Sequence, residues 1–109
     1  MAFDESLANR IRNLLAGKKN VVEKKMFGGI GFLLNGNMMV GIWRESLVVR
    51  LGPNEGRKAI LEPFVREFDI TGRAMTGWAM VEPAGIADES DLNFWIERSL
   101  KFVKTLPKK

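Results

Sequence analysis

The dipeptide Asn35-Gly36 restricts the fold more than any other feature, because it separates two apolar segments of strand length. Asparagine and glycine both tolerate the positive φ angles of a two-residue hairpin turn. We therefore expect the flanking segments to pair as antiparallel strands. Arg44-Glu45 supplies a second short turn, which makes residues 21–51 a three-stranded meander. The predicted strands are residues 21–34, bent at Gly28-Gly29, residues 38–43 and residues 46–51.

Each of three predicted helices begins at a residue whose side chain can accept the free amide groups of a first helical turn. The first and last of these helices also carry apolar residues at helical spacing. The order of elements is then α-β-β-β-α-β-β-α, which predicts one two-layer α+β domain over residues 1–109, an antiparallel sheet with helices. The predicted helices are residues 4–16, 54–61 and 88–106, and the two added strands are residues 68–70 and 78–81.

The two turns set the register of the meander and so divide its side chains between two faces. One face is uniformly apolar and is predicted to be the core. The other is semi-apolar, and we expect it to stay open for a partner, most simply a second copy of the chain. The alternative is that the protein's own chain covers it, and a one-residue slip of register would exchange the faces. The predicted core face holds Leu33, Met38, Val40, Ile42, Leu47, Val49 and Leu51, and the open face holds Ile30, Phe32, Leu34, Met39, Gly41, Trp43, Val48 and Arg50.

Histidine, cysteine and tyrosine are absent from the 109 residues. This excludes disulfides, thiolate metal sites and every histidine-containing catalytic triad. The serines therefore have no histidine base, and nothing in the sequence pairs the acidic residues as acid and base. We expect a protein that is not an enzyme and has no metal or cofactor. The apolar stretches are too short to span a membrane and no signal peptide is evident, so a cytoplasmic protein is the simplest prediction.

The net charge of +4 is concentrated at the two ends of the chain. Residues 1–25 and 97–109 are basic, whereas residues 26–96 are mildly acidic. If the ends meet in space, they form a basic patch that could attract a phosphate backbone. The alternative is an ordinary solvated surface, because no aromatic residues that could stack on bases are interleaved with these basic residues.

Arg50 and Arg73 are the charged residues with the most informative surroundings. Arg50 lies within a predicted strand, and Arg73 lies in a glycine-bounded loop that leads to Trp78. A guanidinium at either position could bind a carboxylate or a phosphate of a partner. The alternative is an internal ion pair, for example with Glu67 or Asp69.

Three stretches of sequence are characteristic when taken together: KMFGGIGF at 25–32 with Asn35-Gly36, LGP at 51–53, and FDITGRAMTGW at 68–78. They resemble the N-terminal domain of the TfoX/Sxy family over nearly the whole chain. The resemblance implies an α+β domain of the type III secretion chaperone-like class, with the same order of helices and strands. Full-length members are similar to co-activators that regulate natural-competence genes, which serve DNA uptake, alongside a cyclic-AMP-responsive transcription factor. They carry a second, helical C-terminal domain for which this chain has no room, so we expect a stand-alone N-terminal domain.

We therefore expect a non-enzymatic regulatory or adaptor domain that acts by protein–protein contact, with another protein or as a homodimer. One alternative is a nucleic-acid accessory protein that uses the basic ends, whose binding would weaken steeply with salt. Another is an enzyme built on Arg50, Arg73 and an acid. The predicted partner-binding residues are Phe32, Met39, Trp43, Arg50, Arg73 and Trp78.

Overall fold

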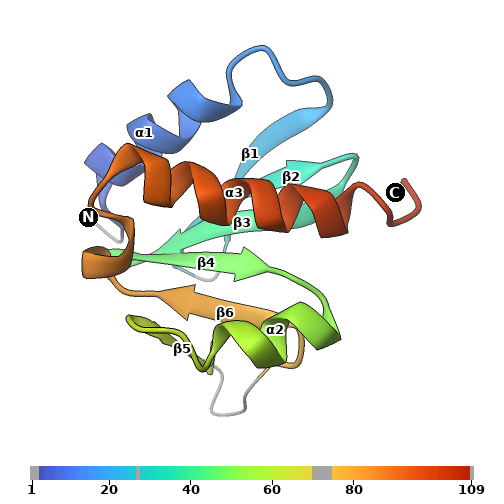
Figure 1. Ribbon diagram of the computed structural model, residues 1–109. Helices are drawn as coiled ribbons and strands as arrows, with labels where there is room; N and C mark the ends of the chain where they lie inside the picture. The colour runs from blue at the N-terminus through green and yellow to red at the C-terminus, as the bar shows by residue number, and fades with distance from the viewer. Residues whose placement is uncertain (1–2, 27, 70–74, 109) are drawn as a thin grey trace.

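The computed structural model describes residues 3–26, 28–69 and 75–108, which form an open six-stranded antiparallel sheet with helices against one face (Figure 1). The strands are β1 (Val21–Met26), β2 (Gly29–Leu34), β3 (Asn37–Trp43), β4 (Ser46–Arg50), β5 (Val65–Arg66) and β6 (Trp78–Val81). The helices are α1 (Glu5–Leu15), α2 (Pro53–Ala59), the short 3₁₀ helix η1 (Pro83–Ile86) and α3 (Glu89–Val103). The spatial order of strands is β1-β2-β3-β4-β6-β5. The predicted α+β class is confirmed, and none of the described helices is long and apolar enough to cross a bilayer.

Both long helices pack as their sequences predict. At the start of α1, the side chain of Asp4 accepts hydrogen bonds from the amides of Ser6 (2.9 Å) and Leu7 (3.2 Å), two donors that a helix leaves unpaired. The apolar side of each helix is turned toward the sheet. The buried residues are Leu7, Ala8, Ile11 and Leu15 in α1, and Leu92, Trp95, Ile96, Ser99 and Val103 in α3.

Residues 21–34 form a hairpin and not the single bent strand that the sequence predicts. β1 pairs with β2 antiparallel along its whole length, so the meander has four strands. Gly28 has a φ of +75°, a backbone conformation that glycine adopts without the steric cost of a side chain. β1 is therefore an edge strand. Its exposed residues Glu23, Lys24 and Lys25 place charge along that edge, which discourages pairing with another chain.

The strand predicted at residues 68–70 is displaced toward the N-terminus. The structure has a two-residue strand at Val65–Arg66, and residues 67–69 have no regular structure. Residue 70 lies outside the described residues. Phe68, whose apolar side chain suggested the strand, is buried for a different reason, because it packs on the sheet face opposite the helices.

The two predicted turns of the meander are confirmed. Asn35 and Gly36 have φ angles of +54° and +83°, and Arg44 has a φ of +59°. Positive φ at these positions matches the twist of the flanking strands, which keeps the paired strands in contact beyond the turn.

Between these turns the register changes at one residue. Leu33 lies opposite Met38, as the turn requires, but Phe32 lies opposite Val40 and not opposite Met39. Met39 is the extra residue of a β-bulge, a local insertion that shifts every later pair by one residue. Phe32 therefore shares a face with Val40, beneath the helices.

The bulge corrects the predicted faces of the meander. Phe32 and Met39 are 1% and 0% exposed and belong to the main core, so their predicted place on an open face is wrong. Ile30 and Leu34 join them in the core, whereas Leu33 and Met38 move to the opposite face. The physical reason is that side chains alternate with a period of two, so one inserted residue exchanges the faces on one side of it.

Ser99 of α3 contacts the sheet directly at the bulge. Its side chain is fully buried, and its hydroxyl lies 2.6 Å from the carbonyl oxygen of Met39 and 2.9 Å from that of Arg50. A bulge disrupts the hydrogen-bond ladder at its extra residue, and a buried carbonyl without a donor is costly. The Ser99 hydroxyl therefore both pairs the bulge and joins α3 to β3 and β4.

We expect the substitution Ser99→Ala to lower the free energy of unfolding by about 1–3 kcal/mol, because it leaves the buried Met39 carbonyl without this donor. Urea unfolding followed by circular dichroism measures the change. The matched control is Thr105→Ala, which removes an exposed hydroxyl that lies 2.6 Å from the Phe102 carbonyl oxygen. We expect the control to change stability by less than about 0.5 kcal/mol. Equal effects of the two substitutions would contradict a special role for Ser99.

Candidate functional site

The candidate site is the surface of the sheet opposite α1 and α3, which we call the far face. Its members follow from the alternation of side chains along each strand and from the pairing between strands. They are Val22, Lys24 and Met26 of β1, Gly29, Gly31 and Leu33 of β2, Met38, Gly41 and Trp43 of β3, Ser46, Val48 and Arg50 of β4, Trp78 and Met80 of β6, and Arg66 of β5.

Half of the far face, over β4 and β6, has a small core of its own. Val48 and Met80 are fully buried there by Phe68, which is 4% exposed. The Phe68 ring lies 5.9 Å from the Trp78 ring, measured between centroids, and the Phe68 carbonyl accepts a hydrogen bond from the Met75 amide. On this half of the far face, the protein's own chain therefore covers the strand side chains, which is the alternative considered from the sequence.

Trp43 and Trp78 lie half-buried against this small core, each beside an arginine. The guanidinium carbon of Arg44 lies 4.5 Å from the centre of the Trp43 ring, and that of Arg50 lies 5.5 Å from the centre of the Trp78 ring. A guanidinium over an aromatic ring is attracted to the negative face of the π system. Apolar packing against the small core and a contact with an arginine therefore both restrict the position of each tryptophan ring.

The other half of the far face, over β1 to β3, is apolar and more open. Leu33 and Met38 are half-buried and Val22 is 60% exposed, and none of the three belongs to either buried cluster. Met26 lies across Gly31, where a Cβ atom would come within 2.8 Å of the Met26 sulfur. Neighbouring apolar side chains that are not packed into a buried cluster are typical of a contact surface.

Charge differs between the two sides of the sheet. Seven ion pairs link the described residues, and each includes a residue of α1, α2 or α3. The charged residues on the strands of the far face are Lys24, Arg50 and Arg66, which are all basic. Within the described ranges, neither Glu67 nor Asp69 pairs with Arg50, so the internal ion pair considered from the sequence is not formed at Arg50, and Arg73 lies outside these ranges.

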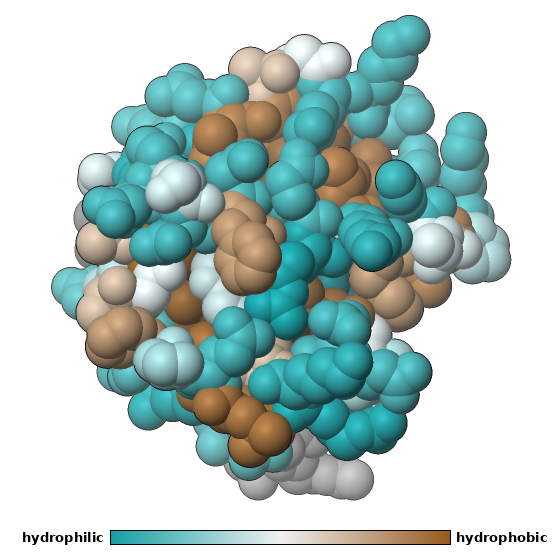
Figure 2. All heavy atoms as spheres, viewed as in Figure 1, coloured by the Kyte–Doolittle hydropathy of each residue, from teal (hydrophilic) through white to brown (hydrophobic). Residues whose placement is uncertain are grey.

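The basic chain ends do come together, because α1 packs beside α3, but glutamates neutralise much of their charge. Hydrophilic residues cover most of this helix side, and hydrophobic residues show between them (Figure 2). A phosphate-binding patch needs cations that are free of acidic partners, so this arrangement favours the ordinary solvated surface. The ion pairs of the chain ends are Arg10–Glu89, Arg12–Glu5, Arg12–Glu23, Lys18–Glu97, Arg98–Glu55 and Arg98–Glu62.

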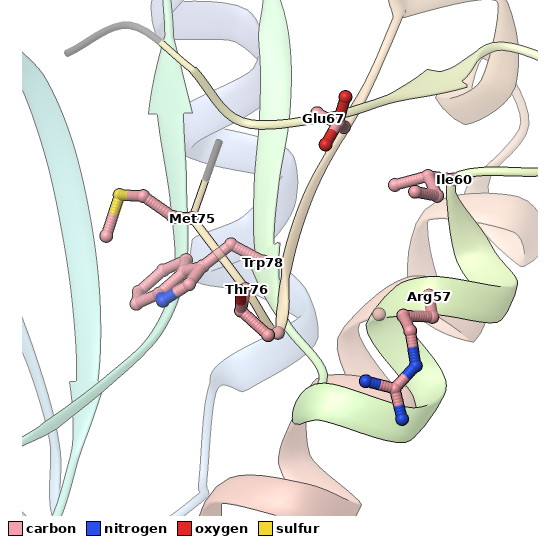
Figure 3. A pocket seen from close by; sticks show the side chains of 8 residues that line it. Arg57, Ile60, Glu67, Met75, Thr76 and Trp78 are labelled. Carbon is pink, nitrogen blue, oxygen red and sulfur yellow. The ribbon is translucent and has the colours of Figure 1, made fainter. Parts of the chain in front are cut away.

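A cavity of about 160 Å³ lies between α2 and the start of β6, beside the far face (Figure 3). Arg57 and Glu67 lie on different sides of it, and the Arg57 guanidinium donates a hydrogen bond to the Asn54 side chain. Ligand pockets usually have volumes of about 300–1,000 Å³ and bring several polar groups together. This cavity is smaller, and its charged groups do not converge. Its lining residues are Gly56, Arg57, Ile60, Glu67, Met75, Thr76, Gly77 and Trp78.

Comparison with known proteins identifies the family. The sequence matches the TfoX N-terminal domain over residues 13–103, which runs from within α1 to the last residue of α3. The chain belongs to the TfoX N-terminal domain family. A search of curated proteins finds none that matches the chain. The resemblance inferred from the three sequence stretches is therefore confirmed, and the match includes the whole sheet.

The predicted partner-binding residues of this TfoX N-terminal domain do not all lie on one surface. Phe32 and Met39 lie in the core, and Arg73 lies outside the described residues. The predicted residues that the far face brings together are Trp43, Arg50 and Trp78.

Sequence reasoning missed two cations of the TfoX N-terminal domain's far face, Lys24 and Arg66. Recognition of Gly28 and Gly29 as a chain reversal would have paired β1 with β2 and placed Lys24 on this face. No comparable signal existed for Arg66, because a two-residue strand is too short to show alternation.

The Arg12–Glu23 ion pair of this domain gives a prediction on pH. The Arg12 guanidinium lowers the pKa of the Glu23 carboxyl, chiefly through the hydrogen bond between them. Because the folded pKa lies below the unfolded value of about 4.3, the stabilisation is present above that value and is lost as the pH falls through the folded pKa. We expect Glu23→Gln to lower the free energy of unfolding at pH 7 by less than about 1 kcal/mol, since both groups are partly exposed.

Urea unfolding of the wild type and Glu23→Gln between pH 7 and pH 2.5 measures this difference, which should shrink to zero at the acid end. The control is Glu45→Gln, at an exposed glutamate outside every ion pair of the described residues. A Glu23→Gln effect that stays constant over the whole range would contradict the prediction.

Proposed function

We propose that this domain is a non-enzymatic regulatory module of natural competence, the uptake of DNA, and that it acts by protein–protein contact through the far face. The observation that carries this proposal is the pair of half-buried tryptophans, Trp43 and Trp78, each beside an arginine on the sheet surface opposite the helices. Membership of the TfoX N-terminal domain family supports the regulatory role.

The chemistry of the far face supports contact with a protein. Tryptophan and arginine are the residues that most often carry the binding energy of protein interfaces. The packing of Trp43 and Trp78 against Val48, Phe68 and Met80 holds both indoles before a partner arrives. Side chains that are already ordered lose less conformational entropy on binding, so their contacts contribute more to affinity.

The residues of the far face support a non-enzymatic role. The guanidinium of Arg50 lies near the Trp78 ring, and among the described residues it forms no ion pair with a carboxylate that could act beside it in proton transfer. The whole sequence also lacks histidine and cysteine, the commonest general base and a strong nucleophile.

We expect Trp43→Glu to abolish the regulatory activity, because it removes an interface anchor and adds charge to an apolar surface. The test restores the gene to a strain that lacks it and measures transcripts of the DNA-uptake genes at equal protein abundance. The control is Leu61→Glu, at a residue that is 86% exposed and lies outside the far face. Circular dichroism of both purified variants checks the fold. Full activity of Trp43→Glu would refute the proposal.

A further inference from the structure

We infer that the partner of the far face is an acidic protein segment with interspersed apolar residues, and not a second copy of this chain. This inference rests on the proposed function, because it takes the far face as the contact surface. It is carried by the sign and the positions of the charges on that face.

Cations occur at both ends of one cross-strand row of the far face. Lys24 begins the row on β1 and Arg66 ends it on β5, the two edge strands of the sheet. With about 4.8 Å between neighbouring strands, five steps separate the two residues by roughly 24 Å. An extended segment of about seven residues has that length, and it would pass over the cluster in which Phe68 covers Val48 and Met80. The row consists of Lys24, Gly31, Gly41, Val48, Met80 and Arg66.

Arg50 adds a third cation, two residues along β4 from this row. Among the described residues, none of Lys24, Arg50 and Arg66 forms an ion pair with a carboxylate. On the helix side, in contrast, three arginines and two lysines are paired with glutamates of the same chain. Electrostatic complementarity at interfaces places a negative surface opposite a positive one. A partner that presents carboxylates would therefore supply the counter-charges that the far face lacks.

The same charges argue against a homodimer that uses this face. In a two-fold contact the same surface of both subunits meets itself. Lys24, Arg50 and Arg66 of one copy would then face the same cations of the other, without strand carboxylates to separate them. Like charges brought together at an interface cost binding energy and select against that partner.

The surroundings of the two tryptophans favour a peptide over a single-stranded nucleic acid. Bases bind such surfaces by stacking on open aromatic faces. Arg44 lies over the Trp43 ring, and Arg50 and Phe68 both lie near the Trp78 ring, so these neighbours compete with a base. Side chains of a peptide can instead contact the indole edges.

The apolar half of the far face indicates what must lie between the carboxylates. Met26, Leu33 and Met38 are only half-buried, and Val22 is largely exposed. Methionine adapts its shape to different apolar groups, which suits a surface that receives apolar side chains. We therefore expect a segment that presents both acidic and apolar side chains on the side facing the sheet to bind more tightly than a purely acidic one.

The test uses fluorescence anisotropy with the full chain and four labelled probes. These probes are a nine-residue peptide that repeats Glu-Glu-Leu-Leu, so that each side of the extended chain carries both residue types, a counterpart with lysine for glutamate, a counterpart with serine for leucine, and an oligo-dT of equal charge. We expect the glutamate–leucine peptide to bind at least tenfold more tightly than each of the others at low salt. Tighter binding of oligo-dT, or equal binding of all probes, would overturn the inference.

The double variant Lys24→Glu/Arg66→Glu should weaken binding of the glutamate–leucine peptide at least tenfold. The matched control, Lys101→Glu/Lys104→Glu, changes the net charge equally on exposed residues of the helix side. We expect the control to bind as the wild type does, and an equal loss in both variants would show a non-specific charge effect and overturn the inference. Thermal unfolding confirms that both variants fold.

Sedimentation velocity of the wild type and Trp43→Glu tests directly whether a second copy of the chain binds the far face. We expect the two proteins to have the same oligomeric state, whereas a dimer that Trp43→Glu dissociates would overturn the inference.

The outcomes of these experiments also distinguish the inferred partner from the proposed function. If peptide binding depends on Lys24 and Arg66 but Trp43→Glu retains full regulatory activity, the inferred chemistry of the face stands and the proposed function fails. If Trp43→Glu abolishes activity but the acidic peptide does not bind, the proposed function stands and the inferred chemistry of the partner fails.

Discussion

The contact between the Ser99 hydroxyl and the bulge at Met39 fixes the arrangement on which both faces of the sheet depend. The bulge directs Phe32 and Met39 into the core, so the helices rest on a continuous apolar surface. Ser99 lies on the otherwise apolar side of α3, and the bulge is what gives its buried hydroxyl a partner. One polar residue thus links the register of β3 to the position of a helix distant in sequence.

The sheet separates two kinds of surface that the composition alone does not distinguish. On the helix side, many charges are balanced within the chain, because the helices lie close enough for arginines and glutamates to pair. On the far face, Trp43 and Trp78 are positioned by a small core, and the strand charges have one sign. A surface with ordered aromatic anchors and unbalanced charge is suited to recognise a partner of opposite charge. The regulatory role proposed for this TfoX N-terminal domain depends on that asymmetry.

Much of the candidate site could be predicted from the sequence, and the rest failed for identifiable reasons. The far-face positions of Trp43 and Arg50 could be predicted because these residues lie on the two strands that flank the Arg44-Glu45 turn, and β3 and β4 pair across that turn without irregularity. The positions of Phe32 and Met39 could not be predicted because Met39 is itself the bulged residue and Phe32 lies beyond the bulge from the Asn35-Gly36 turn, which sets the register. Burial of part of the face by Phe68 was not predicted, because its strand-like pattern gave no sign that it would fold back over β4 and β6.

The sequence by itself determined what depends on neighbours a few residues away: the Asp4 cap, the turn at Asn35-Gly36, the apolar sides of the helices and the α+β class. Tertiary structure decided which strand side chains became core, which cations kept no partner, and which half of the far face was covered. The physical reason is the distance along the sequence between the residues that interact. A cap or a turn is stabilised within one segment, whereas the bulge is paired by Ser99, sixty residues beyond Met39.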